Sequence, residues 1–251
     1  MFTFYIAIIF VLGSCIGWFI GILVYRLPRR IPLLSSPTCD YCNSKLKSKY
    51  QIPILGYIFS LRRCSNCFRK IPFHYFLIEI ITPILLITLF LKFGFSLQYY
   101  LYSLLTILCI TIFFTDLFNR IIPDVLTLPF IAVGILFSFW NNLGFIESIK
   151  GSIFGGAIFF IIAILYKRIT KKEGLGRGDI KLIAMIGSFL GFKLTFLTIF
   201  LSSFLGMIIV LISKHYNKMF IPFGSYIVVA TYLSILIGNQ IIESYLKLWR
   251  I

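Results

Sequence analysis

The chain has 251 residues, of which 59% are hydrophobic and only 13% are charged, and its formal net charge is +16. Soluble domains are typically about half apolar and a quarter charged, so this composition excludes an ordinary soluble domain and indicates a polytopic membrane protein. The positive charge could indicate binding to nucleic acid, but its distribution along the chain favours a membrane topology instead.

The first predicted element is a membrane span, Phe2–Tyr25, which contains no charged residue. A stretch of this length can cross a bilayer core of about 30 Å. It lacks the basic start of a secretory signal peptide, so we expect it to remain uncleaved. A polar insert, residues 26–72, follows it and holds ten Lys or Arg residues and a single acid.

The insert carries two Cys-x2-Cys pairs separated by 21 residues: Cys39, Cys42, Cys64 and Cys67. Four thiolates with this spacing are typical of a closed tetrahedral zinc site, and the alternative is two redox-active pairs. A closed site leaves no coordination position for a substrate. We therefore expect the zinc ion to stabilise the fold of a small extramembrane insert.

Seven further apolar segments follow, which brings the predicted number of membrane spans to about eight. The sequence thus predicts an all-α polytopic membrane protein with two regions. Residues 1–92 hold the first two spans and the insert, and residues 93–251 hold a six-span core. The later spans are predicted at Phe73–Leu91, Leu97–Thr115, Val125–Trp140, Ile149–Tyr166, Ile180–Phe192, Leu194–Ser213 and Ile221–Ile242.

The basic residues orient these spans. If the spans alternate in direction, the insert and the loops on its side of the membrane carry 19 of the 24 Lys and Arg residues. Cytoplasmic loops carry such an excess, so the insert is predicted to be cytosolic and both termini to lie outside. The charge is then explained by topology and by attraction to anionic lipid, and we expect no nucleic acid partner.

Two carboxylates, Asp116 and Asp179, are expected at the same depth on the cytosolic side. Asp116 ends one span, and the span that contains Asp179 must begin near Gly176 to be long enough. Ionisable residues are costly within a membrane and indicate function by default. Two neighbouring carboxylates that share a proton can serve as the base and the acid of an aspartic protease, without a metal. The alternative is two interfacial charges paired with nearby basic residues.

Other polar and small residues lie near this pair. Gly176 and Gly178 flank Asp179 and would let an extended substrate backbone approach closely. Asp124 follows a proline at the start of a predicted span. We interpret it as a helix N-cap in preference to a catalytic residue.

Four sequence blocks, taken in order, resemble the type IV prepilin peptidase family of pili, type II secretion and competence systems. The blocks are YRLP (25–28), IPILGYIFSLRRCSNC (52–67), DLFNRIIPDVLTLP (116–129) and GRGD (176–179), the last followed by Lys181. The resemblance covers nearly the whole chain. It implies that Asp116 and Asp179 are the catalytic pair of a Gly-x-Gly-Asp membrane protease.

The resemblance further implies the substrates and the location. Members of this family cut prepilin-like proteins after a Gly, at the cytosolic face of the bacterial inner membrane. Many then methylate the new N-terminal amine with S-adenosylmethionine, an activity associated with the first region. Glu79 matches a glutamate common in the family, and it either assists methyl transfer or pairs with a basic neighbour.

The first span departs from the family pattern. Trp18 and Gly21 stand where Ser and Asn are usual, and the sequence leaves open whether methyl transfer is retained. Two other classes of protein share single features with this chain. A transporter would use membrane carboxylates but usually shows internal repeats, which we do not find, and a membrane redox protein would explain the cysteines but not the aspartates. Oligomeric state leaves no signal in the sequence.

Overall fold

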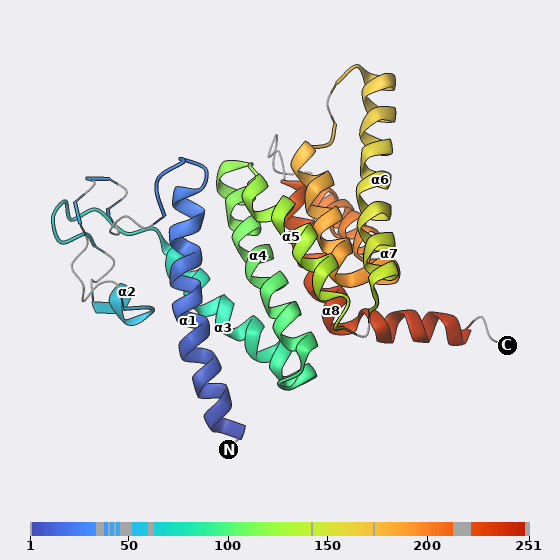
Figure 1. Cartoon of the computed structure of the whole chain (residues 1–251). Helices are drawn as coiled ribbons and strands as arrows, with labels where there is room; N and C mark the ends of the chain where they lie inside the picture. The colour runs from blue at the N-terminus through green and yellow to red at the C-terminus, as the bar shows by residue number, and fades with distance from the viewer. Residues whose placement is uncertain are drawn as a thin grey trace. The chain divides into compact units, whose positions relative to one another are not determined.

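The computed structural model describes residues 2–33, 38–39, 41–42, 44–45, 52–59, 63–141, 143–172, 174–212 and 222–248. Within these ranges the regular elements are eight α-helices, and two isolated antiparallel bridges occur in the polar insert. The expected all-helical class is therefore confirmed (Figure 1). Contacts divide the chain into two compact units, Met1–Phe95 and Ser96–Ile251.

The first unit is built on two long helices, α1 (Phe2–Arg26) and α3 (Phe73–Phe93), which pack against each other. Glycines permit a close approach. A Cβ atom added to Gly13 or Gly17 would lie 2.7 Å or 2.8 Å from a backbone atom of α3. Small residues are common where membrane helices touch, because they let the two backbones come into contact.

The polar insert is tied to both helices. At the end of α1 the buried Arg26 side chain donates hydrogen bonds to two backbone carbonyls of the following segment, at 3.2 and 2.7 Å. The short helix α2 (Leu55–Phe59) contributes Tyr57, whose ring stacks on Phe76 of α3 with centroids 4.9 Å apart. The insert thus packs on one end of the helix pair.

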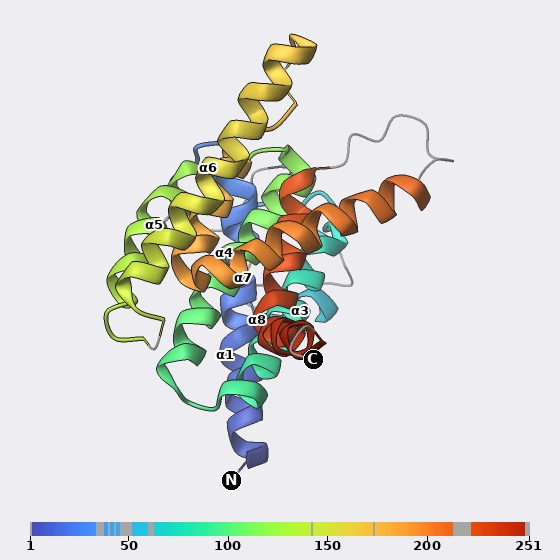
Figure 2. The same cartoon turned by 90° about the vertical axis from the view of Figure 1, so that its right-hand side faces the viewer.

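The second unit contains five helices, of which α7 is central because it packs against the other four. Figure 2 shows these helices gathered around α7, drawn in orange. They are α4 (Leu97–Asn119), α5 (Asp124–Phe137), α6 (Phe145–Thr170), α7 (Arg177–Ile212) and α8 (Phe223–Leu248).

Helices α6 and α7 meet along glycines. A Cβ atom added to Gly155 would lie 2.9 Å from the carbonyl oxygen of Ile183, so the two backbones are nearly in contact. Ser148 donates a 2.6 Å hydrogen bond to the Ser188 carbonyl across the same contact. At Gly191, φ is 73° and ψ is 179°, a conformation that favours glycine, and the helix is kinked there.

Six described helices, α1, α3, α4, α6, α7 and α8, are long and apolar enough to cross a membrane. The difference from the predicted count of about eight spans has two causes. The segment predicted at Val125–Trp140 forms the 14-residue α5, which is shorter than a span requires. The segments predicted at Ile180–Phe192 and Leu194–Ser213 are two halves of α7, which meet at Gly191.

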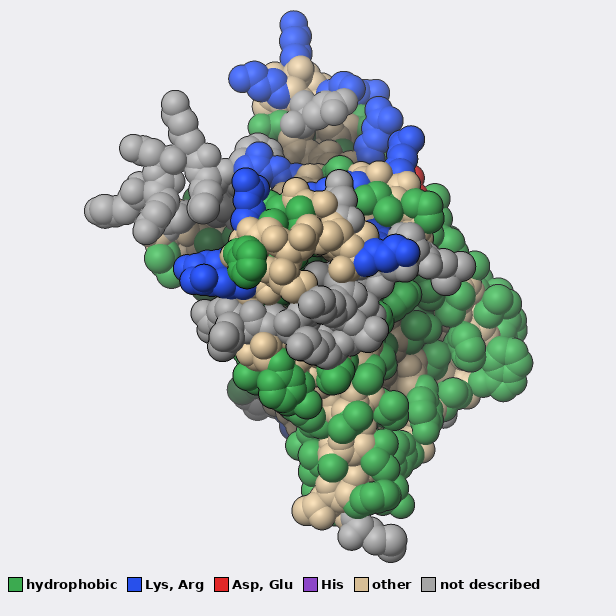
Figure 3. Space-filling model, turned by 90° about the vertical axis from the view of Figure 1, so that its left-hand side faces the viewer, with side chains coloured by type: hydrophobic (Ala, Val, Ile, Leu, Met, Phe, Trp, Pro, Cys, Tyr) green, Lys and Arg blue, Asp and Glu red, His purple; other side chains and the backbone are tan. Residues whose placement is uncertain are grey.

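The outward-facing side chains of these helices are largely apolar, as expected for contact with lipid. On the face drawn in Figure 3, hydrophobic side chains and Lys or Arg side chains gather in separate areas. Segment 213–221, which belongs to a predicted cytosolic loop, lies outside the described residues.

Candidate functional site

The two predicted catalytic carboxylates both lie in the second unit. Asp116 is in the last turn of α4 and Asp179 is in the first turn of α7. Both are buried, with 6% and 8% of their surface exposed. Because α7 begins at Arg177, its start agrees with the position near Gly176 that the length of the segment predicted.

A glycine in the first turn of α8 lies against both carboxylates. A Cβ atom added to Gly224 would lie 2.6 Å from Oδ2 of Asp116 and 3.2 Å from Oδ1 of Asp179. The two oxygen atoms are therefore separated by no more than the sum of these distances. This places the carboxylates close enough to share one reacting group.

Each carboxylate also accepts a hydrogen bond from a backbone amide. The amide of Ser225 donates to Oδ2 of Asp116 at 3.1 Å, and the amide of Gly176 donates to Oδ2 of Asp179 at 3.2 Å. Both amides lie at the start of a helix, where N–H groups lack an intrahelical partner. These bonds fix the orientation of the two side chains and leave their other oxygens for further contacts.

The connection between α4 and α5 covers two glycines beside the pair. A Cβ atom added to Gly178 would lie 2.8 Å from Cβ of Ile122, and one added to Gly224 would lie 3.0 Å from Cδ1 of the same residue. The chain turns into this connection at Arg120, whose φ of 55° is in the left-handed region. Ile122 thus packs against the first turns of both α7 and α8.

Three residues of this site were not predicted from the sequence: Ile122, Gly224 and Ser225. A signal for the last two was present, because the predicted topology starts the last span on the same side of the membrane as Asp116 and Asp179. For Ile122 there was no local signal, since isoleucine is common throughout the apolar segments of this chain.

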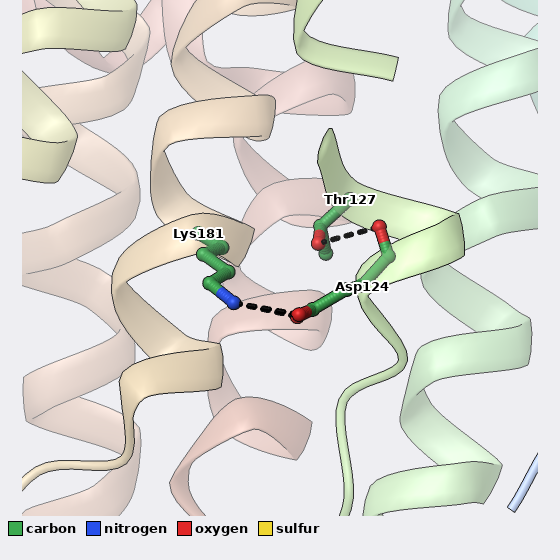
Figure 4. Close-up of polar contacts among 3 residues, drawn as sticks. All are labelled: Asp124, Thr127 and Lys181. Carbon is green, nitrogen blue, oxygen red and sulfur yellow. Dashed lines mark hydrogen bonds and ion pairs between the residues drawn. The ribbon is translucent and has the colours of Figure 1, made fainter. Parts of the chain in front are cut away.

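Asp124 and Lys181 form an ion pair that joins α5 to α7. The Lys181 ammonium lies 2.7 and 2.8 Å from the two oxygens of Asp124. Figure 4 shows the two side chains pointing toward each other from α7 and α5. The expectation that Asp124 caps its helix was wrong. Pro123 occupies the N-cap position and no side chain caps the helix, because the Asp124 carboxylate turns towards α7 instead. Thr127 donates a 3.3 Å hydrogen bond to the Asp124 carbonyl.

Glu79 lies in the first unit, on α3, and is buried. Its Oε2 atom accepts a 2.6 Å hydrogen bond from the amide of Ile54 in the insert. The carboxylate also lines a cavity of about 120 Å³. The walls of the cavity are aromatic, basic and aliphatic, and include Trp18, Tyr75 and Arg26.

The two residues of the first span that differ from the family pattern, Trp18 and Gly21, line this cavity. A Cβ atom added to Gly21 would lie 3.0 Å from Cδ1 of Tyr75, so the tyrosine ring takes the space into which a larger side chain would extend. The glycine and the tyrosine therefore fit each other.

The four spaced cysteines come together in the insert. Their sulfur atoms all lie within 4.8 Å of one another, with Cys39 to Cys67 at 3.8 Å and Cys42 to Cys64 at 3.9 Å. Zn–S bonds of about 2.3 Å in a tetrahedron place sulfur atoms about 3.8 Å apart, so the donor set fits zinc. An isolated bridge closes each turn, Thr38 with Lys45 and Arg63 with Lys70.

The protonation of these thiols is uneven. Burial raises the pKa of the Cys39 thiol to about 11, whereas a hydrogen bond with the Ser44 hydroxyl lowers the pKa of Cys42 to about 6. Hydrogen bonds from the amides of Cys67 and Asn66 lower the pKa of Cys64. A zinc ion binds thiolates, so its binding would release protons from thiols that are protonated beforehand.

The fold and these sites define a helical polytopic membrane protein with a buried pair of carboxylates and a tetracysteine insert. Two family models match the chain. The model described as "Type IV leader peptidase family" matches residues 103–211, and the one described as "Bacterial Peptidase A24 N-terminal domain" matches residues 11–93.

Curated relatives match over most of their length. A prepilin leader peptidase/N-methyltransferase of Pseudomonas aeruginosa is 30% identical, over 94% of this chain and 91% of the relative. Proteins of the same name from Aeromonas hydrophila and Neisseria gonorrhoeae are each 27% identical, over 96% and 89% of this chain and 94% and 87% of the relatives. The chain therefore belongs to the type IV leader peptidase family. No solved structure matches it significantly.

Proposed function

We propose that this chain is a membrane-embedded aspartic endopeptidase that removes the leader of type IV prepilin-like proteins, with Asp116 and Asp179 as catalytic residues. One observation carries the proposal: two buried carboxylates from different helices border the same glycine, Gly224. The family supports the substrate class, because its curated relatives are named prepilin leader peptidases. A transporter or a membrane redox protein is not favoured.

The chemistry follows from the like charge of the pair. Two close, buried carboxylates do not both ionise easily, so one of them holds a proton. The ionised carboxylate takes a proton from water as its oxygen attacks the scissile carbonyl carbon. The protonated carboxylate donates a hydrogen bond to the carbonyl oxygen and then protonates the leaving amine as the C–N bond breaks. This mechanism uses no metal.

Glycines and an ion pair support the catalytic residues in this proposal. Gly176 presents backbone without a side chain beside Asp179, which lets a substrate strand come close. Gly178 instead leaves the space that Ile122 fills. The pair formed by Asp124 and Lys181 joins the start of α5 to the first turn of α7. Its role is to position the turn that carries Asp179.

The proposed orientation puts the catalytic pair and the insert on the cytosolic side of the bacterial inner membrane, with both termini outside. The cut then follows a Gly at the cytosolic end of the substrate's apolar helix. The excess of Lys and Arg on one side of the alternating spans supports this orientation. Zinc, held by Cys39, Cys42, Cys64 and Cys67, would stabilise the insert.

Methyl transfer is a second candidate function, and the cavity beside Glu79 favours it. Bound S-adenosylmethionine would supply the methyl group. In this proposal the Glu79 carboxylate removes a proton from the new N-terminal amine. Aromatic walls such as Trp18 and Tyr75 suit a cationic, purine-bearing ligand. Under this proposal the first unit methylates and the second unit cuts.

The test uses purified protein in liposomes with a precursor that carries a basic leader ending in Gly, then Phe and an apolar helix. Mass analysis of the product would show a cut after Gly. Asp116→Asn and Asp179→Asn each should lower the rate by at least about a hundredfold while the protein inserts normally, because each removes the acid–base function of one carboxylate. Unchanged cutting by both variants would reopen the transporter class.

A further inference from the structure

Ile122 is the apolar side chain that contacts both Gly178 and Gly224, the glycines beside the carboxylate pair. It belongs to the short connection between α4 and α5 and is only partly buried. Its Cβ lies 2.8 Å from the position of a Cβ atom on Gly178, and its Cδ1 lies 3.0 Å from that position on Gly224. The isoleucine side chain therefore spans the first turns of α7 and α8.

The Cδ1 atom of Ile122 and the oxygens of both carboxylates surround the same glycine, Gly224. The same added Cβ atom would lie 2.6 Å from Oδ2 of Asp116 and 3.2 Å from Oδ1 of Asp179. The tip of Ile122 and one oxygen of each carboxylate therefore approach the same side of Gly224. A scissile carbonyl must lie within reach of both carboxylates to be attacked and protonated, so the residue that carries the carbonyl comes close to Ile122.

We propose that Ile122 is a specificity-determining residue, which limits the residue on the amino side of the cut bond to glycine. This inference rests on the proposed function, since it concerns the substrate of the same carboxylate pair. The backbone of a glycine passes Ile122 without contact from a side chain. Any Cβ atom on that residue would have to share the space next to Cδ1 while the carbonyl stays between the two aspartates.

The experiment compares two precursors that differ only in the residue before the cut, Gly or Ala. The wild-type protein should cut the Gly precursor and discriminate strongly against the Ala precursor. Ile122→Ala should lower the Gly-to-Ala ratio of kcat/KM by about tenfold or more, because removing methylenes from an apolar wall changes discrimination by about that factor per methylene. Ile121→Ala is the matched control, since this neighbour is 48% exposed and should leave the ratio unchanged.

Ile122→Val removes only the terminal methyl and retains the branched side chain. It therefore tests the proposal if Ile122→Ala does not fold. A ratio that falls in either folded variant supports the proposal. A ratio equal to that of the wild type in a folded Ile122 variant that still cuts the Gly precursor overturns it. A folded variant that loses cleavage of the Gly precursor also overturns it, because Ile122 would then be needed for catalysis itself. If the wild-type protein cuts neither precursor, the proposed function fails, which is a separate result.

Discussion

The amide of Ser225 donates a 3.1 Å hydrogen bond to Oδ2 of Asp116 across 109 positions of sequence. This contact makes the first turn of α8 part of the carboxylate site. The match to the leader peptidase family model ends at residue 211, before α8 begins at Phe223. The site therefore includes residues beyond the segment that defines the family.

Replacing Gly224 by alanine should disable cleavage. The added Cβ atom would lie 2.6 Å from Oδ2 of Asp116, so the carboxylate or the helix must move. A misplacement of about 1 Å in an active site can lower the rate about a hundredfold, and we expect a fall of this order in kcat with little change in KM. Steady-state kinetics on the Gly precursor would measure both constants.

Gly206→Ala is the matched control, because its Cβ atom would meet its nearest neighbour, Tyr226, at an ordinary 3.7 Å. This variant should cut at the wild-type rate. Equal activity of the Gly206 and Gly224 variants would mean that α8 does not constrain the carboxylates.

Replacing Lys181 by methionine should cost little stability. The pair with Asp124 is short, but the two side chains are 32% and 57% exposed, and exposed ion pairs contribute about 0–1 kcal/mol. We expect the free energy of unfolding to fall by less than about 1 kcal/mol. Cleavage should persist at a rate lowered by no more than about fivefold, because the pair helps to position the turn that carries Asp179 and about 1 kcal/mol of barrier corresponds to about that factor. Thermal unfolding in detergent, together with an Asp124→Asn variant and the double variant, would give the coupling energy.

The pair formed by Lys150 and Glu147 provides a reference, since its lysine is 59% exposed and the pair joins neighbouring turns of one helix. Lys150→Met should have a still smaller effect. A loss of cleavage in Lys181→Met with unchanged stability would instead assign Lys181 a direct part in the reaction.

Replacing Glu79 by glutamine should separate the two activities. Glutamine can still accept the hydrogen bond from Ile54 through its side-chain carbonyl, but it cannot take a proton from an amine. We expect Glu79→Gln to cut the precursor normally and to leave the product unmethylated. Mass analysis of the product with and without S-adenosylmethionine would detect the missing methyl group.

A purely structural role for Glu79 predicts a different pattern, in which the glutamine variant methylates normally and only Glu79→Ala fails. If the wild-type protein does not methylate the product at all, methyl transfer is absent from a chain that has Gly21 packed against Tyr75.

The insert should hold one zinc ion per chain. Metal analysis of purified protein would measure it, and Cys64→Ser should abolish it, because structural zinc sites require all four ligands. Without zinc, residues 26–72 should become sensitive to protease, since binding of the metal contributes directly to folding. Cys15→Ser is the control, as Cys15 lies on α1 away from the cluster. Protein without zinc, but with two disulfides, would favour the redox alternative.

The sequence was enough to predict that Asp116 and Asp179 lie close together. Alternating spans put the end of one and the start of the other on the same side, and the length of the segment sets its start near Gly176. The spacing of the cysteines predicted their cluster for a similar reason, since each turn is local. The ion pair of Asp124 was not foreseen. A helix cap can be predicted from residues that are neighbours in sequence. Lys181 is 57 positions away and comes close to Asp124 only because α5 packs on α7.

The apolar pattern misled the count of spans at α5, whose 14 residues are too few to cross a membrane. The break predicted at Lys193 lies close to the observed one, because the backbone at Gly191 is not helical and divides α7 into two helical segments. Ile122 could not be found from pattern, because its importance comes from two glycines far away in the chain.

The contact of α8 with Asp116 has a consequence for any attempt to isolate the smallest active fragment. A chain shortened before Phe223 would keep both aspartates and the two motif blocks that contain them, yet it would lack the amide of Ser225 that orients Asp116. Such a fragment should be inert, and supplying residues 222–248 as a separate polypeptide in the same membrane should restore cleavage by complementation.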